Sequence, residues 1–147
     1  MGNYLKGKRC TPISDGAVMY LTEKDHFVPD IVCAPEKIQN TGVYGAPDLV
    51  AEVLSPTASR NDCGRKMQTY ARCGVLEYWI VSPGGRSVEQ YFLQDGSLVL
   101  HDICQSYTAD FLEVMKAEER AALVTEFRCS LFDDLSIRLD DVFYWVK

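Results

Sequence analysis

Short apolar segments separated by turn-forming residues dominate the first part of the chain. Residues 17–21 (AVMYL), 27–34 (FVPDIVCA) and 49–55 (LVAEVLS) are rich in β-branched, aromatic and other apolar side chains. Each segment is bounded by residues that favour turns, and this pattern is typical of strands. The sequence therefore predicts three strands in this region.

The pattern changes to a helical period after Pro56. Asn61 or Asp62 is suited to cap a helix, and Gly74 is suited to end it. The apolar side chains of this segment recur at i, i+3 and i+4, which places on one face Met67, Tyr70 and Ala71. We therefore expect an amphipathic helix between Pro56 and Gly74.

The middle of the chain predicts further strands. Residues 77–81 (EYWIV) form a continuous apolar run that is typical of a buried strand. Residues 87–93 (SVEQYFL) alternate with a period of two, and Asp95-Gly96 then leads into residues 97–103. Because Asp-Gly favours the tight turns of hairpins, we expect these last two segments to pair.

Two further elements complete the predicted order. Residues 108–124 have a helical pattern, and residues 135–139 form a short apolar run that predicts a last strand. The order strand, strand, strand, helix, strand, hairpin, helix, short strand is that of an α+β or α/β layered domain. We expect a single domain over residues 1–147, because this length is typical of one domain.

Composition and charge narrow the choice of function. The net charge of −6 disfavours a nonspecific nucleic-acid coat, which is usually basic, but it is compatible with a carboxylate-rich metal site. No apolar stretch approaches the roughly 20 residues of a membrane span, and the N-terminus lacks the apolar core of a secretory signal. We therefore expect a cytoplasmic protein with no membrane partner. The six cysteines contain no CxxC pair, which disfavours structural zinc, and we expect reduced thiols.

Two carboxylates lie inside apolar segments that are predicted to be strands. Asp30 stands within residues 27–34, and Glu52 stands within residues 49–55. Burying an unpaired carboxylate is costly, so two of them on adjacent strands indicate a hard-oxygen site suited to Mg²⁺ or Mn²⁺. Asp48 is too far along the strand to share an ion with Glu52, since four residues span about 13 Å. The alternative that the residues alone leave open is ordinary turn chemistry at Pro29-Asp30 and an edge charge at Glu52.

A longer combination of motifs adds to this pattern. The segment FVPDIVCAP, followed by PDLVAEVLSP, Asp62, Lys66, Tyr70 and EYWIV, resembles the Uma-type restriction endonucleases, a large bacterial family with the PD-(D/E)XK nuclease fold. The resemblance covers roughly residues 13–93, and the segment SLFDDLSIRLDDVF resembles the family's C-terminal strand. It implies a restriction-endonuclease-like mixed sheet flanked by helices. It also implies metal-dependent hydrolysis of phosphodiester bonds in DNA.

The resemblance also assigns roles to particular residues. It implies that Asp30 and Glu52 are the catalytic carboxylates that hold Mg²⁺ or Mn²⁺, with the Val53 carbonyl as a possible extra ligand. Leu54 stands where the family element has its lysine, so the resemblance implies that Lys66 supplies the catalytic amine from the following helix. The alternative for Lys66 is an exposed partner of Asp62 at i, i+4. Near this helix lie three arginines that could meet backbone phosphates or form a solvated face: Arg60, Arg65 and Arg72.

The chain departs from the family pattern at its start. Family members usually carry an N-terminal helical segment, and here the first predicted strand begins almost at once. We therefore expect an uncovered sheet surface and a homodimer. The departure, together with Leu54, favours as an alternative a non-catalytic interaction module with the nuclease fold. A hydrolase with a cysteine or serine nucleophile and His26 or His101 is a second alternative, which no motif supports.

Overall fold

A six-stranded mixed sheet forms the centre of the computed structural model, which describes residues 11–14, 16–34, 38–39, 42–55 and 60–146. The strand order is β1-β4-β7-β8-β9-β10. In chain order these strands are β1 (Thr11–Ser14), β4 (Ile31–Ala34), β7 (Leu49–Val53), β8 (Glu77–Ser82), β9 (Ser87–Gln94) and β10 (Ser97–Gln105). Within the described sheet, β7 and β8 form the one parallel pair, and the other neighbours are antiparallel.

Helix α2 (Arg60–Cys73) connects the two parallel strands and covers one face of the sheet. Two parallel neighbours need such a crossover because the end of the first strand and the start of the second lie at opposite ends of the strands. On this face the helix packs through Tyr70 and Ala71 against Val50 and Tyr78. The predicted helix between Pro56 and Gly74 is confirmed, and Gly74 follows its end with φ of +92°.

The C-terminal segment packs on the opposite face of the sheet. It contains β11 (Glu126–Arg128), β12 (Ser136–Arg138) and α5 (Leu139–Val142). The ring of Trp79 meets the ring of Phe127 edge to face at 5.1 Å, and both belong to a cluster with Leu139 and Phe143. Each face of the sheet therefore has its own apolar core.

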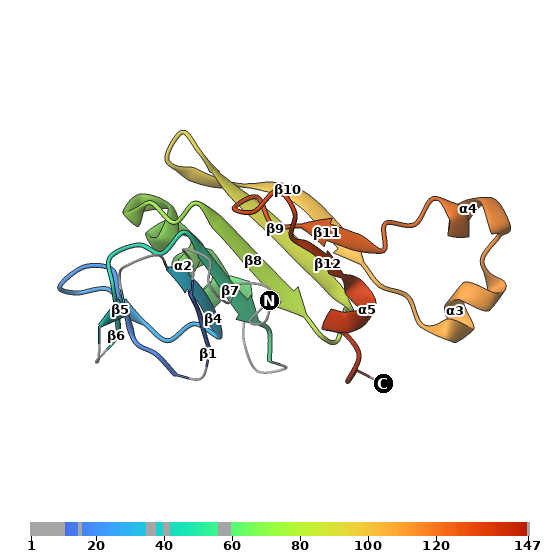
Figure 1. Cartoon of the computed structure of the whole chain (residues 1–147), viewed down its shortest axis with the longest axis horizontal. Helices are drawn as coiled ribbons and strands as arrows, with labels where there is room; N and C mark the ends of the chain where they lie inside the picture. The colour runs from blue at the N-terminus through green and yellow to red at the C-terminus, as the bar shows by residue number, and fades with distance from the viewer. Residues whose placement is uncertain (1–10, 15, 35–37, 40–41, 56–59, 147) are drawn as a thin grey trace.

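A second, smaller sheet lies beside the N-terminal strands of the main sheet (Figure 1). Its order is β3-β2-β6-β5, formed by β2 (Met19–Tyr20), β3 (His26–Phe27), β5 (Ile38–Gln39) and β6 (Gly42–Tyr44). Met19 and Val43 are fully buried and extend the core beneath α2. The predicted strand 17–21 is therefore shorter than expected and belongs to this small sheet.

The predicted strand over residues 27–34 is interrupted. β3 ends at Phe27 and β4 begins at Ile31, so Asp30 lies in a bend directly before β4 rather than in mid-strand. Pro29 explains the interruption, because proline has no N–H to donate to a strand ladder.

The predicted helix over residues 108–124 is also interrupted. It consists of α3 (Ala109–Val114) and α4 (Ala117–Ala121), with extended backbone at Met115 and Lys116 between them. Neither of these two described helices contains a buried residue. Figure 1 shows them projecting away from the sheet, so no tertiary packing supports one continuous helix here.

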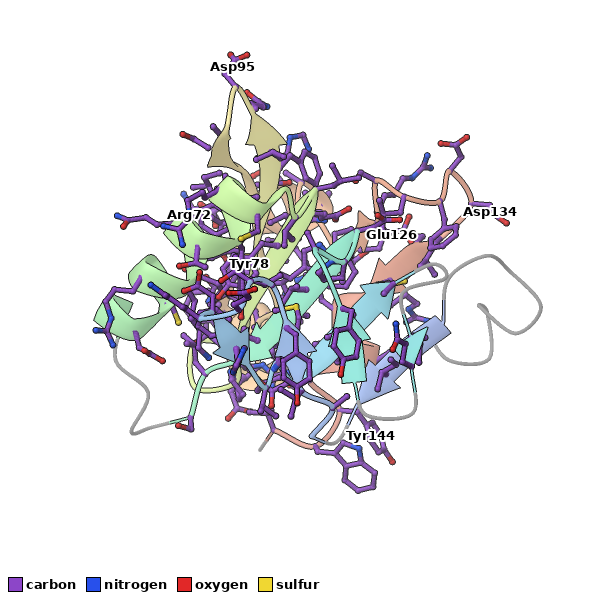
Figure 2. All side chains as sticks on the ribbon, turned by 90° about the vertical axis from the view of Figure 1, so that its left-hand side faces the viewer. Arg72, Tyr78, Asp95, Glu126, Asp134 and Tyr144 are labelled. Carbon is purple, nitrogen blue, oxygen red and sulfur yellow. The ribbon has the colours of Figure 1, made fainter. Side chains whose placement is uncertain are left out.

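The hairpin prediction is confirmed, and it marks one end of the molecule. Asp95 and Gly96 have φ of +49° and +80°, as a tight two-residue hairpin turn requires. Figure 2 shows Asp95 at the hairpin tip and Tyr144 at the opposite end.

The cysteines differ from expectation at one described position. Cys33 is disulfide-bonded, so the prediction of uniformly reduced thiols is wrong there. Cys63, Cys73, Cys104 and Cys129 are free. No helix in the described part of the chain is long and apolar enough to cross a membrane.

Candidate functional site

The pairing of β4 with β7 brings the two predicted carboxylates together. The last paired residues are Ile31 and Ala51. Asp30 lies in the bend directly before Ile31, beside Val53, the residue that follows Glu52 on β7. The β7–β8 register pairs Glu52 with Ile80, so Glu52 faces the α2 side of the sheet.

Asp30 is exposed and binds the backbone of β7. The Val53 backbone N–H donates to Asp30 Oδ2 at 2.7 Å, and this bond ties the bend before β4 to the end of β7. Val53 therefore contacts the predicted site through its N–H group. The proposal that its carbonyl binds a metal remains a prediction.

Glu52 is buried, with 6% of its surface exposed, and both of its oxygens accept hydrogen bonds from α2. The Lys66 ammonium lies 3.1 Å from Glu52 Oε2, and the Tyr70 hydroxyl donates to Oε1 at 2.7 Å. Lys66 and Tyr70 are four residues apart, so they lie one helical turn apart on the same face. The buried carboxylate is thus matched by one cation and one neutral donor, which offsets the cost of its burial.

Lys66 contacts both partners that the sequence suggested. Besides the contact with Glu52, its ammonium lies 3.9 Å from Asp62 Oδ2. The Lys66 side chain is 22% exposed and that of Asp62 is 49% exposed, so the contact with Asp62 is the more solvent-screened one. The amine therefore points toward Glu52, as the geometric expectation for a catalytic lysine required.

The arginines near α2 have different surroundings. Arg65 is 85% exposed and lies 3.6 Å from Asp62, whereas Arg72 donates to Asp25 at 3.0 Å. The side chain of Arg60 is outside the described residues. Arg72 is thus held at the last turn of α2, and Arg65 is the one that extends into solvent near Lys66.

Burial near Glu52 keeps the neighbouring acidic groups protonated. Burial, followed by the charge of Glu52 and the hydrogen bond to it, raises the pKa of Tyr70 far above its ordinary value. Burial also raises the pKa of the Cys63 thiol, with a further contribution from Glu52. Tyr70 is consequently a permanent hydrogen-bond donor to Glu52. Cys63 is a poor nucleophile, since the thiolate is the reactive form.

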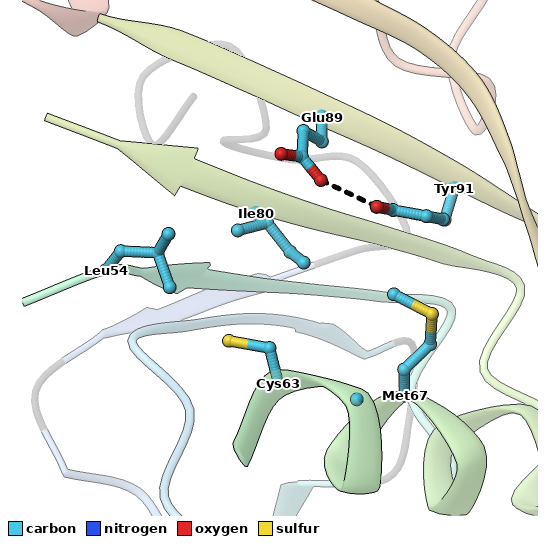
Figure 3. A pocket seen from close by; sticks show the side chains of 7 residues that line it. Leu54, Cys63, Met67, Ile80, Glu89 and Tyr91 are labelled. Carbon is cyan, nitrogen blue, oxygen red and sulfur yellow. Dashed lines mark hydrogen bonds between the residues drawn. The ribbon is translucent and has the colours of Figure 1, made fainter. Parts of the chain in front are cut away.

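A cavity of about 110 Å³ lies between α2 and the sheet, beside the Glu52 contacts. Figure 3 shows its lining, which consists of Leu54, Cys63, Gly64, Met67, Ile80, Glu89 and Tyr91. Ile80 pairs with Glu52 on one side and with Glu89 on the other, so the two carboxylates lie in one row across β7, β8 and β9. Glu89 is buried and accepts a hydrogen bond from the Tyr91 hydroxyl at 2.6 Å.

Two of these side chains were not assigned to the site from the sequence. The sequence places Tyr70 on the apolar face of α2 and in the motif combination that carries the resemblance, and its spacing of four from Lys66 was the available signal of a shared target. Glu89 lies in a strand whose side chains alternate between the two faces of the sheet. It points to the same face as Tyr91, two residues later, and this was the available signal. Both residues become recognisable only when the strand register is known.

The donor set around Asp30 fits a hard divalent cation. Mg²⁺ is commonly held by one or two carboxylates and keeps several waters, so a site with two protein carboxylates is sufficient. Within the described residues no group of three or more His, Cys, Asp or Glu side chains could hold a metal ion. The Lys66 ammonium already places a positive charge beside Glu52 Oε2.

Comparisons with known proteins find a matching family, a related sequence and a similar fold. The Uma2 family model, described as "Putative restriction endonuclease", matches residues 2–123. An uncharacterized protein of Synechocystis sp. (strain PCC 6803) is 31% identical over 97 residues, which are 63% of this chain and 51% of that protein. The chain thus spans about half the length of this curated relative.

A solved structure has the same fold. A crystal structure described as a putative nuclease belonging to DUF820, from Anabaena variabilis, matches with a TM-score of 0.68 at 20% identity. The match covers 99% of this chain and 75% of that chain. At this level of identity the likeness shows a shared fold.

Proposed function

Since this chain belongs to the Uma2 family of putative restriction endonucleases, we propose that it is a Mg²⁺- or Mn²⁺-dependent endonuclease that hydrolyses phosphodiester bonds in DNA. The observation that carries the proposal is the buried Glu52 carboxylate, which faces Lys66 at 3.1 Å and directly precedes Val53, whose backbone N–H donates to Asp30. An acidic group this buried, with an amine directed at it, matches the arrangement that phosphoryl hydrolysis needs.

Each residue of the proposed site has a distinct task. Asp30 and Glu52 would hold the cation, with the Val53 carbonyl as an additional oxygen. The bound ion would polarise a phosphoryl oxygen and lower the pKa of an attacking water. Lys66 would stabilise the negative charge that develops on the phosphoryl group, because its amine lies near Glu52 and is partly shielded from bulk solvent.

The acidic net charge of −6 influences how DNA would bind. A chain with this negative charge attracts the DNA phosphate backbone only weakly at long range. DNA binding must therefore rely on local contacts near α2. Arg65 is a candidate for these contacts, because it is exposed and adjacent to Lys66. We therefore expect cleavage to be strongest at low salt, since phosphate contacts weaken as salt rises.

The experiment that tests the proposal combines metal titration with DNA cleavage. Purified protein is titrated with Mn²⁺ by calorimetry, and nicking of supercoiled and single-stranded DNA is followed with Mg²⁺, with Mn²⁺ and with EDTA. Metal binding together with EDTA-sensitive nicking is the expected outcome. Absence of both would leave the non-catalytic module, which needs no metal, as the better account.

A non-catalytic interaction module is the second candidate, and one observation favours it. Leu54 occupies the position of the family's lysine, and its side chain packs beside the core under α2 instead of providing an amine. In this account the Lys66–Glu52 ion pair would be a structural contact only. Equal stability with and without divalent metal would support it.

We also propose a homodimer of single-domain chains. Strand β10 forms one edge of the main sheet, and its exposed apolar side chains are those of Val99, Leu100 and Ile103. A long apolar edge strand is a template for pairing with another chain. Light scattering at micromolar concentration tests this, and a clean monomer would contradict it.

A further inference from the structure

The Glu52 carboxylate is held at two points that differ in rigidity. Tyr70 is fully buried, and its ring packs edge to face against Phe27 at 5.3 Å and against Tyr78 at 5.2 Å. Lys66 is partly exposed and has a second acceptor in Asp62. One contact of the carboxylate is therefore fixed by core packing, while the other can be exchanged.

We propose that Tyr70 is the positioning residue of this site, which holds Glu52 through Oε1 so that Oε2 is the oxygen offered to a divalent cation. The inference rests on the proposed function and deepens it. It assigns a different task to each of the two donors from α2. Tyr70 keeps its hydrogen bond when a cation binds, and Lys66 gives up its place on Oε2 and turns toward Asp62.

Electrostatics supports this division of tasks. An ammonium group and a divalent cation repel each other strongly at contact distance, so both cannot occupy Glu52 Oε2. Lys66 has a flexible side chain and an acceptor within 3.9 Å, so it can move without losing all of its charge pairing. The neutral Tyr70 hydroxyl has no such conflict, and its hydrogen bond fixes the rotation of the carboxylate plane. Hydrogen bonds of this kind commonly orient metal-binding carboxylates.

The chain provides a matched control in Tyr78. This tyrosine is also fully buried, lies on the same face of the sheet and packs against Tyr70. The Glu52 carboxylate accepts its hydrogen bonds from Lys66 and Tyr70, and the neighbour of the Tyr78 hydroxyl is the Cys63 thiol. Removing the hydroxyl of Tyr78 therefore changes the same aromatic cluster while leaving both contacts of Glu52 in place.

The test compares the full chain with its Tyr70→Phe and Tyr78→Phe variants by Mn²⁺ titration calorimetry. We expect Tyr70→Phe to weaken Mn²⁺ binding on the order of 10-fold, as loss of an orienting hydrogen bond typically does, and Tyr78→Phe to leave it unchanged. Thermal unfolding without metal provides a second readout. It is measured on Tyr70→Phe and Tyr78→Phe, on Glu52→Gln, and on the two double variants that combine Glu52→Gln with each tyrosine substitution. The effects of Tyr70→Phe and Glu52→Gln should be non-additive, because the two groups are in contact, whereas those of Tyr78→Phe and Glu52→Gln should add.

The possible outcomes separate this inference from the proposed function. If wild type binds Mn²⁺ and Tyr70→Phe binds it equally well, the positioning role is wrong and the nuclease proposal stands. Equal weakening by both tyrosine variants would attribute the effect to core packing and would also overturn the inference. If wild type binds no Mn²⁺, the proposed metal site fails and the inference fails with it. If Tyr70→Phe does not fold, the hydroxyl is required for the fold itself, and the positioning role is overturned in favour of a structural one.

Discussion

Two buried glutamates on adjacent strands of the same sheet have very different surroundings. Glu52 on β7 faces α2 and is bound by a lysine and a tyrosine, and the next residue, Val53, binds Asp30. Glu77 on β8 faces the opposite side and has no exposed surface. The two glutamates differ in the charge of their partners: Glu52 is paired with a lysine, whereas Glu77 accepts hydrogen bonds from neutral groups.

The partners of Glu77 are neutral and belong to the fold. Trp79 Nε1 donates to its Oε1 at 2.5 Å and Gln90 Nε2 donates to it at 3.2 Å. The Ser130 backbone N–H donates to Oε2 at 3.0 Å, and the Ser130 hydroxyl donates to the same oxygen. These bonds join the C-terminal segment to the main sheet. Glu77 is thus an internal anchor, whereas Glu52 has a partner that can be displaced and a neighbouring carboxylate that is exposed.

The largest expected effect concerns cleavage. Glu52→Ala and Asp30→Ala should each reduce DNA nicking by on the order of 10³-fold or more, because each removes an oxygen ligand and a bound metal contributes several kcal/mol to catalysis. The double variant should be little worse than either single one, since metal ligands act as a unit. Nicking of supercoiled DNA at low salt measures this. Additive losses in the double variant would argue against a shared ion.

The next effect concerns stability at the other glutamate. Glu77→Ala should lower the free energy of unfolding by about 3 kcal/mol or more, because it leaves several buried donors without an acceptor. Urea unfolding measures the change. Glu77→Gln, which retains one acceptor oxygen, serves as the milder control. A loss of nicking without any loss of stability in Glu77→Ala would contradict the assignment of this residue as an anchor.

A smaller effect is expected at Lys66. Lys66→Met should lower the nicking rate by about 10²-fold, in the range seen when one transition-state donor is lost. It should not weaken Mn²⁺ binding, because the lysine occupies Glu52 in the metal-free protein and is not a ligand for the ion. Single-turnover cleavage and calorimetry on the same preparation separate the two effects. Weaker Mn²⁺ binding in Lys66→Met would show that the lysine organises the site rather than competing for it.

The smallest effect is expected at Asp48, the carboxylate set aside because of its distance along β7. Its backbone N–H donates to Cys33 and its carbonyl accepts from Glu77, so its contribution to the sheet is made largely by the main chain. Asp48→Ala should therefore change nicking less than about twofold and stability by less than about 1 kcal/mol. Nicking assays and urea unfolding of this variant check the expectation. A loss comparable to that of Asp30→Ala would mean that the wrong aspartate has been assigned to the site.

The sequence predicted the elements that are fixed by local pattern. Helix α2, strand β8 and the Asp95-Gly96 hairpin follow from apolar spacing and turn chemistry, and all three are present. The resemblance to the Uma-type family and the restriction-endonuclease-like fold are confirmed by the family match and by the similar solved structure.

The sequence could not predict features that depend on long-range packing. The break between α3 and α4 reflects a segment with no buried residue, which a helical pattern alone does not reveal. The contact of Tyr70 with Glu52 joins residues that are 18 positions apart, and it requires the crossover of α2 onto the sheet. Asp30 was assigned to mid-strand because its neighbours are apolar, and the effect of Pro29 on the strand was underestimated.

The most direct test of the central claim is nicking of supercoiled DNA with Mn²⁺ by wild type, Glu52→Ala and Glu77→Gln prepared in parallel. We expect EDTA-sensitive nicking by wild type and by Glu77→Gln, and its loss in Glu52→Ala while that variant remains folded. Equal nicking by wild type and Glu52→Ala would reveal a contaminating nuclease and would contradict the assignment of this buried carboxylate to catalysis.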